Sequence, residues 1–172
     1  GLADLGIAYP TTEDGTGKKT DIENNTTVIS NGVGLTMKGG NTTATRIWLT
    51  ANGALDLRVY KGATLTFAVA DGYEITKVVF DGSALTNLAV GGIAIDGTTW
   101  EGSQKTVTFE VNATVKINTI AITVAYTRSV TSGKYGTICL PYGSSDMTGA
   151  IFYEVAYLNE STMRVFVDEV TE

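Results

Sequence analysis

Five carboxylates are the first candidates for chemistry, because they lie close together in one part of the chain. They are Asp71, Glu74, Asp81, Asp96 and Glu101. A retaining glycosidase needs two carboxyl groups about 5 Å apart, and an inverting glycosidase needs a wider gap. The sequence does not bring any two of these side chains to such a distance. All three aspartates precede glycine, and Asp-Gly is an ordinary turn pair. We therefore expect solvated turn residues.

The residue types of the chain give little support to other kinds of catalytic or metal-binding site. The chain has no histidine, which removes imidazole bases and histidine-containing metal sites. The single cysteine, Cys139, stands between Ile138 and Leu140, and a buried, inert thiol is expected there. Oxygen ligands for calcium are plentiful, but no spacing of the EF-hand type occurs. We expect no catalytic residue, no bound metal and no cofactor.

Two tryptophans are candidates for stacking against sugar rings. Such stacking requires a flat aromatic face exposed beside polar hydrogen-bonding groups. Trp48 follows Arg46 at a spacing of two, so both side chains can lie on one face of a strand. Arg46 and Trp48 are therefore the candidate carbohydrate-binding residues, with packing against the sheet as the alternative for Trp48. Trp100 is expected in a turn, with a structural role.

Composition and charge restrict the class of protein. The 172 residues are 43% hydrophobic and only 17% charged, with 20 glycines and two prolines. The net charge is −6 and the sequence contains no basic run, so we expect no nucleic-acid partner. No apolar run is long enough to form a transmembrane helix. The chain begins GLADLG, and any signal peptide is expected to have been removed already.

The stretch from Leu57 to Phe80 organises the predicted fold. Its sequence, LRVYKGATLTFAVADGYEITKVVF, indicates two or three strands joined by tight turns. The run 64–69 alternates large apolar side chains with Thr and Ala, as a half-buried strand does. The pair Asp71-Gly72 predicts a hairpin to the run 73–80, and Asp81-Gly82 predicts a second turn at its end.

The remaining segments mostly repeat this pattern of short strands and turns. We expect an edge strand within residues 1–10, a loop over 11–25 and a loop or helical turn over 83–92. Asp56 and Arg58 are expected to form a solvated ion pair on an exposed face, worth roughly 0–1 kcal/mol. The other predicted strands are 26–29, 33–38, 45–50, 55–60, 105–111 and 114–126. In the run 105–111, we expect Val107, Phe109 and Val111 to face inward.

This pattern predicts an all-β fold. About ten short strands, with turns every 8–12 residues or so, favour an antiparallel, jelly-roll-like β-sandwich. We assign the sandwich to residues 1–126. Residues 127–172 are predicted to form a small β-meander of three strands, or part of a second module. Such a meander buries little surface by itself.

Several short strand and turn motifs are formed by Arg58, Tyr60, Gly62, Ile75, Thr76, Lys77, Trp100, Gly102, Val107, Thr108, Phe109, Ile117 and Ile120. Together these motifs resemble a β-rich domain of secreted and surface proteins of gut Bacteroidetes. The resemblance covers roughly residues 20–126, and residues 133–170 resemble the start of a second module of the same proteins. It implies an exported β-rich protein and no particular activity.

Three functions remain open at this point. The first is a non-catalytic extracellular or cell-surface module for binding or adhesion, with glycans or other surface proteins as partners. The second is a structural spacer or assembly domain of a larger surface protein. The third is an exported carbohydrate-active enzyme, which would need two acidic residues converging in a cleft. The sequence leaves the oligomeric state undetermined.

Overall fold

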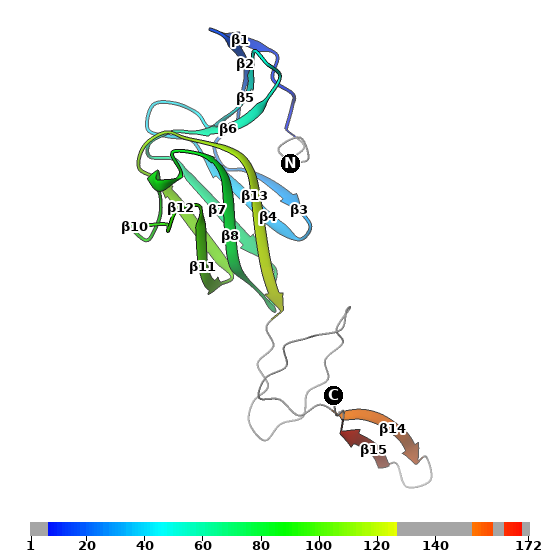
Figure 1. Ribbon diagram of the computed structural model, residues 1–172. Coiled ribbons are helices and arrows are strands. Elements are labelled where there is room, and N and C mark those ends of the chain that lie inside the picture. The colour runs from blue at the N-terminus through cyan, green and yellow to red at the C-terminus, as the bar shows by residue number, and fades with distance from the viewer. Residues whose placement is uncertain (1–6, 127–152, 160–163, 170–172) are drawn as a thin grey trace. The chain divides into compact units, whose positions relative to one another are not determined.

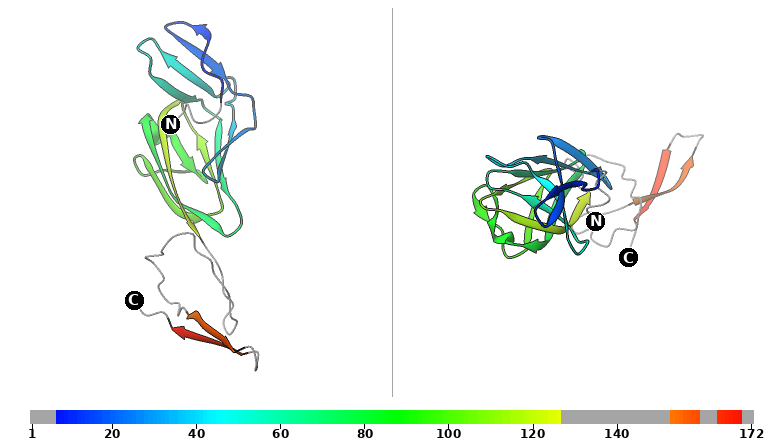
Figure 2. Two further views of the ribbon diagram at one scale, coloured as in Figure 1. Left: turned by 90° about the vertical axis from the view of Figure 1, so that its right-hand side faces the viewer. Right: turned by 90° about the horizontal axis from the view of Figure 1, so that it is seen from above.

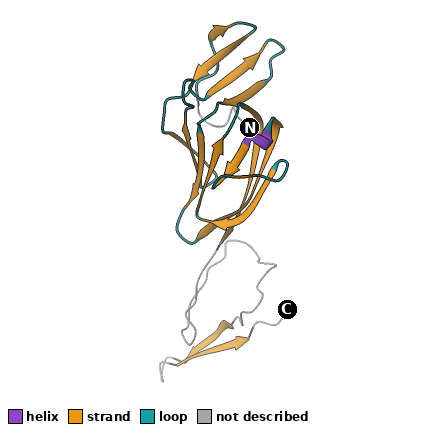
Figure 3. Ribbon diagram, turned by 90° about the vertical axis from the view of Figure 1, so that its left-hand side faces the viewer, coloured by secondary structure: helices purple, strands orange, loops and turns teal. Residues whose placement is uncertain are grey.

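The structure of the chain is a computed structural model that describes residues 7–126, 153–159 and 164–169 (Figure 1). The chain divides into two compact units, Gly1–Ser129 and Val130–Glu172. Strands dominate the described residues, and the helical segment is the single turn η2 (Leu85–Asn87) (Figure 3). None of the described residues belongs to a helix long and apolar enough to span a membrane.

The first unit is a jelly roll built from strands β6 to β13. Four of them lie in the sheet that we call sheet A, in the order β6-β13-β8-β11, and four in sheet B, in the order β7-β12-β9-β10. Successive strands alternate between the two sheets, except that β9 and β10 form a hairpin. This connectivity defines an eight-stranded jelly roll. The bounds are β6 Leu55–Val59, β7 Thr64–Val69, β8 Tyr73–Ser83, β9 Leu88–Val90, β10 Ile93–Ala94, β11 Thr99–Gln104, β12 Thr106–Val111 and β13 Val115–Tyr126.

Five earlier strands widen both sheets. Strands β1 (Thr12–Asp14), β2 (Gly17–Asp21) and β5 (Arg46–Thr50) continue sheet A beyond β6, and we call them the N-terminal extension. Strands β3 (Thr26–Ser30) and β4 (Val33–Lys38) continue sheet B beyond β7. Figures 1 and 2 show β1, β2 and β5 together at one end of the unit. The predicted antiparallel, jelly-roll-like sandwich is confirmed.

One prediction for the start of the chain needs correction, and another is tested only in part. Residues 11–25, predicted as a loop, contain the β1–β2 hairpin, which turns through Gly15. Residues 7–10 form no strand, while residues 1–6 lie outside the described part. Two adjacent acidic residues on β1 form ion pairs with two adjacent lysines on β2, and the hairpin has little apolar periodicity. A search based on hydrophobic alternation therefore misses it.

Alternating apolar residues of the facing sheets fill the core. The rings of Phe67 and Phe109 from sheet B meet Phe80 from sheet A, with centroid separations of 4.9 to 6.4 Å. Edge-to-face contacts of this kind are favourable beyond the area that they bury. The predicted inward faces of β7 and β12 are confirmed. Their buried residues are Leu65, Phe67, Val69, Val107, Phe109 and Val111.

The connection at Asp71-Gly72 is a turn, as predicted, but it does not form a hairpin. It joins β7 in sheet B to β8 in sheet A, and these two strands do not pair with each other. Turn residues specify that the chain reverses, while the strand partners are chosen by long-range packing. Here the reversal carries the chain across the core, from one layer of the sandwich to the other.

The second predicted turn, Asp81-Gly82, lies inside a strand. Both residues belong to β8, and Gly82 pairs with Ile117 on β13, next to a register shift between Ile117 and Thr119. A Cβ atom on Gly82 would lie 2.0 Å from the carbonyl oxygen of Lys116. This glycine is therefore required by the close approach of two backbones at an irregular point of the sheet.

Two further segments differ from expectation. Within residues 83–92, the predicted helical turn is present as η2, but it is followed directly by β9. Trp100 lies on strand β11, not in a turn. Both β9 and β11 are short strands with little alternation of their own, so their place in a sheet depends on neighbours that are distant in the sequence.

In the second unit, β14 (Tyr153–Asn159) and β15 (Arg164–Glu169) form an antiparallel pair. They correspond to the last two strands of the predicted three-stranded meander. The first predicted strand of that meander, over residues 135–143, lies outside the described residues. Cys139 lies within it, so its predicted burial stays a prediction.

The aromatic contact across the core gives the first testable prediction. Replacing Phe109 by alanine removes a ring that touches Phe67, Phe80 and Trp100, and leaves a cavity between the sheets. We expect the free energy of unfolding to fall by about 3–5 kcal/mol. Glu110→Ala, an exposed position on the same strand, should change it by less than about 0.5 kcal/mol. Urea unfolding measures both, and equal effects would contradict this account of the core.

Candidate functional site

The two predicted site residues lie on the outer face of the N-terminal extension. The strand register forms two rows across sheet A. In one row Lys19, Trp48 and Asp56 are direct cross-strand neighbours. In the other, Asp21, Arg46, Arg58 and Lys116 follow one another. We call this surface the polar face, and it consists of Asp14, Lys19, Asp21, Arg46, Trp48, Asp56, Arg58 and Tyr60.

Trp48 is the centre of the polar face, and its indole is covered. The guanidinium of Arg58 lies over the ring, 3.8 Å from the centroid. A Cβ atom on Gly17 would lie 2.7 Å from Trp48 Nε1, so only glycine leaves room for the indole beside β2. Trp48 is consequently 9% exposed. An arginine stacked on a tryptophan stabilises the folded state by about 0.5–2 kcal/mol, and the contribution is larger when the contact is shielded from water.

The pair formed by Asp56 and Arg58 is largely buried, and not solvated as the sequence predicts. Asp56 is 7% exposed, and Arg58 Nε donates a hydrogen bond of 2.8 Å to Asp56 Oδ1. A second hydrogen bond, from Arg58 Nη2 to Asp56 Oδ2, measures 3.4 Å. The alternation along β6 correctly places both side chains on the face of the strand that points away from Leu57. It does not reveal that strands flank β6 on both sides, so that Trp48 and its neighbours bury the pair.

Arg46 is the second anchor of the polar face. Its Nη1 donates a hydrogen bond of 3.3 Å to Asp14 Oδ2, and its guanidinium lies 5.4 Å from the centre of the Tyr60 ring. Arg46 Nε is 2.8 Å from Asp21 Oδ1, yet this buried nitrogen lacks a hydrogen bond of good geometry. Lys19 Nζ lies 3.3 Å from Asp14 Oδ2, which joins β1, β2 and β5 in one network.

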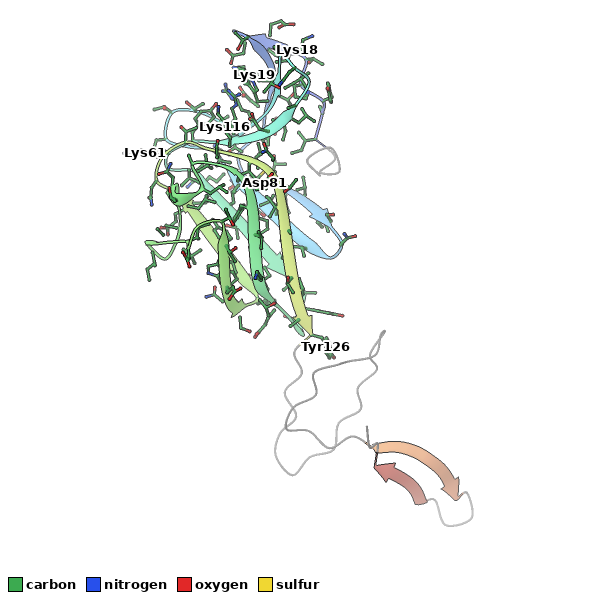
Figure 4. All side chains as sticks on the ribbon, in the orientation of Figure 1. Lys18, Lys19, Lys61, Asp81, Lys116 and Tyr126 are labelled. Atoms are coloured by element: carbon green, nitrogen blue, oxygen red, sulfur yellow. The ribbon has the colours of Figure 1, made fainter. Side chains whose placement is uncertain are left out.

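The charges of the polar face balance. Three carboxylates, on Asp14, Asp21 and Asp56, contact three cations, on Lys19, Arg46 and Arg58. The side chains of Asp14 and Asp21 are 40% and 46% exposed, so the acceptors at the rim of the network face solvent. The exposed Lys116 follows Arg58 in the register and lies at the same end of the unit as Lys19 (Figure 4).

The five carboxylates that opened the sequence argument do not converge. Asp71 and Glu101 form ion pairs with Lys105 and Lys77, while Glu74 accepts a hydrogen bond from a serine. The part of the chain that the structure describes holds no group of three His, Cys, Asp or Glu side chains placed to bind a metal ion. The predicted absence of a metal site stays a prediction for the whole chain.

Two of these ion pairs change carboxyl acidity. The Lys105 ammonium donates a hydrogen bond to Asp71 and adds its charge, which lowers the pKa of that carboxyl. Lys77 acts in the same way at Glu101, where Nζ lies 2.8 Å from Oε1, and lowers the pKa of Glu101. Both carboxyls are fully exposed, so these are surface effects that salt weakens.

Trp100 belongs to the core boundary and not to the polar face. It packs against Phe109 edge to face, with 6.2 Å between the ring centroids, and a Cβ atom on Gly102 would lie 2.5 Å from the indole. From its position on strand β11, the tryptophan packs against the core of the sandwich. This geometry fits the structural role that the sequence predicts for Trp100.

Sequence reasoning found two members of the polar face and missed most of the others. It placed Arg46 and Trp48 on one face of a strand, which the register confirms. It missed Asp14, Lys19 and Asp21, because the β1–β2 hairpin was predicted to be a loop. The acidic pair Glu13-Asp14 before Gly15 and the basic pair Lys18-Lys19 after it are the signal that could have shown a hairpin.

The chain matches no protein-family model, and searches of curated proteins and of solved structures also find no match. The site therefore has to be interpreted from its own geometry.

The buried ion pair gives the second prediction. Arg58→Met removes the cover of Trp48 and leaves the Asp56 carboxylate buried without its partner. We expect the free energy of unfolding to fall by about 3 kcal/mol, since an isolated buried charge is costly. Lys18→Met is the matched control, because Lys18 pairs with Glu13 at an exposed position and should change stability by less than about 0.5 kcal/mol.

The same pair allows a second comparison. Replacing both partners, as in Asp56→Leu with Arg58→Met, should recover most of the lost stability, because no unpaired charge then remains. Chemical denaturation of the four proteins measures these differences. If Arg58→Met were as mild as Lys18→Met, the pair would be solvated, as the sequence alone suggested.

The Asp71–Lys105 pair gives a prediction about pH. Because the pKa of Asp71 is lowered in the folded state, the pair stabilises the fold above the ordinary pKa of an aspartate, about 3.9, and this contribution is lost as the pH falls through the folded-state pKa. In Lys105→Met, the Asp71 pKa should return toward its ordinary value, as measured by NMR titration. The difference in melting temperature between the two proteins should shrink as the pH falls through the folded-state pKa of Asp71, and vanish once this carboxyl is protonated in both. An unchanged Asp71 pKa would refute the pairing.

Proposed function

We propose that this chain is a non-catalytic binding module of an exported or cell-surface protein, and that its polar face binds glycans. The observation that carries the proposal is the arrangement of planar polar groups around Trp48. Arg46 and Arg58 present fixed N–H donors, while Asp14 and Asp21 present partly exposed carboxylate oxygens beside them. Neighbouring hydroxyl groups of a sugar ring both donate and accept, so they match donors and acceptors that alternate along a surface.

The rigidity of the polar face supports this function. Arg58 is held by two hydrogen bonds to Asp56 and by the Trp48 ring, and Arg46 by contacts with two aspartates and Tyr60. Side chains that are already immobilised lose little entropy when a ligand binds. The network is electrically balanced, which suits a neutral, hydroxyl-rich ligand better than a strongly charged one.

Several features of the sequence agree with a binding role outside the cytoplasm. The absence of histidine and the single cysteine leave few routes to nucleophilic or acid–base catalysis. The net charge of −6 disfavours nucleic acid. The resemblance to secreted and surface domains of Bacteroidetes gives the proposed location, at the cell surface or in the medium.

A structural role in a larger surface protein is the second proposal. One observation favours it: Trp48 is only 9% exposed, and Arg58 occupies the ring face on which a sugar would stack. In this interpretation the polar face only holds the N-terminal extension to the jelly roll. Stacking on Trp48 would require Arg58 to move, whereas hydrogen bonding at the rim requires no movement.

The test is a binding screen with the intact chain and two matched variants. A panel of plant and host glycans is added at millimolar concentration, and the melting temperature is measured, since a ligand of the folded state raises it. Asp21→Asn changes an acceptor on the polar face. Glu13→Gln makes the same chemical change on β1, at a residue whose partner Lys18 lies on the opposite face from Lys19.

The glycan proposal expects one class of sugar to raise the melting temperature of the wild-type chain and of Glu13→Gln. The shift should fall at least several-fold in Asp21→Asn. A sugar that binds all three proteins equally would exclude the polar face as the site. A panel without any response, together with a cooperative unfolding transition, would reject glycan binding and favour the structural role.

A further inference from the structure

The free edges of the two sheets differ in how they are protected against pairing with another strand. In the described part of the chain, sheet A ends in β1 and β11, and sheet B ends in β10 and β3. Strand β1 has three residues, two of them acidic, and β10 has only two residues. Strand β11 contains a register shift and the charged Glu101. Short length, charge and irregular register are the usual protections of an edge.

Strand β3 lacks these protections. Its five residues, Thr-Thr-Val-Ile-Ser, carry no charge and no proline, and they pair with β4 without any register shift. Three of the four kinds of residue favour strands. The side chain of Ile29 is 76% exposed, opposite Gly34, which has no side chain to cover it. Figure 1 shows β3 beside β4 at the margin of the sandwich.

The turn next to β3 shows which backbone groups are free. Ser30 and Val33 flank a two-residue turn, Asn31-Gly32, in which both residues have positive φ, as in a type I′ hairpin. The residues that flank such a turn form a hydrogen-bonded pair, and hydrogen-bonding directions alternate along an antiparallel strand. Ser30, Val28 and Thr26 therefore point their N–H and C=O groups toward β4. Thr27 and Ile29 point theirs away from the sheet.

We propose that this edge binds the β3 strand of a second copy of the chain, in antiparallel register centred on Val28. In that register Thr27 lies opposite Ile29 of the second copy, and Ile29 lies opposite its Thr27. All four outward N–H and C=O groups of each strand are then paired, in four hydrogen bonds. The strand is thus complementary to itself, which is the requirement for a two-fold symmetric contact.

The side chains of β3 fit the same register. Val28 faces Val28 of the second copy at a position where the alternation leaves no hydrogen bond, and side chains approach most closely there. Ile29 gains an apolar contact with the methyl group of threonine and loses its exposure. Between residues 24 and 32 no side chain is charged, so the contact itself has no electrostatic conflict. The net charge of −6 on each copy opposes association at low salt.

The first test is self-association, measured by sedimentation equilibrium of the intact chain at 0.15 M salt or above. We expect a weak, concentration-dependent dimer, because one strand pair buries a small area. Ile29→Lys should raise the dissociation constant at least tenfold. Ile93→Lys is the matched control: Ile93 is 77% exposed on the other edge of sheet B, and its substitution should leave the dissociation constant unchanged.

The second test establishes the register. In a Cys139→Ser background, Val28→Cys should form a disulfide-linked dimer on mild oxidation, because residues facing each other without hydrogen bonds have Cα atoms about 4.5 Å apart. Ile29→Cys should not, because Ile29 faces Thr27 and not itself. A chain that stays monomeric at millimolar concentration would overturn the proposal. A dimer that Ile29→Lys does not weaken, or cross-linking at 29 but not at 28, would also overturn it.

Discussion

The contact between Phe80 and the two phenylalanines of the opposite sheet is the interaction on which the rest of the fold depends. The rings of Phe67 and Phe109 belong to sheet B, that of Phe80 to sheet A, and all three are almost fully buried. To bring them together, the chain must cross repeatedly between the layers. Strand pairs that are distant in sequence, such as β6 with β13, form as a consequence. Closing the long loops of such a sandwich costs conformational entropy, and the burial of the aromatic core offsets this cost.

That dependence explains which parts of the fold could be predicted. The period of two in KTVTFEV and TLTFAV reports one buried face, so the inward residues of β12 and β7 were predicted correctly. Asp71-Gly72 marks a reversal equally well, but the local sequence cannot distinguish a hairpin from an arch between sheets. In a hairpin β8 would form hydrogen bonds with β7, whereas in the arch it forms them with β13. Only the packing of the whole sandwich determines which pairing forms. Gly82, required by a backbone contact with Lys116, was mistaken for a turn for the same reason.

The polar face shows a similar limit. Spacing placed Arg46 and Trp48 side by side, and alternation placed Asp56 and Arg58 opposite Leu57. Neither pattern could reveal that Arg58 covers Trp48, because that contact joins diagonal positions on two neighbouring strands. The acidic and basic residues of the β1–β2 hairpin were misinterpreted, since a strand held by ion pairs lacks apolar periodicity. Strands held together by ion pairs thus show a weaker sequence pattern than strands whose apolar residues fill a core.

The polar face and the β3 edge belong to different sheets, and this separation connects the two proposals. A two-fold axis perpendicular to sheet B, midway between the two facing Val28 residues, keeps the cores of both copies on the same side of the joined sheet. Sheet A of each copy then lies on that side as well, with the outer faces of both pointing in the same direction. Two polar faces would thus be presented together to a surface that carries repeated ligands. Linked weak sites of this kind gain apparent affinity through effective concentration without any new contact. An unprotected edge, otherwise a liability for a β-sandwich, would then make a weak individual site useful.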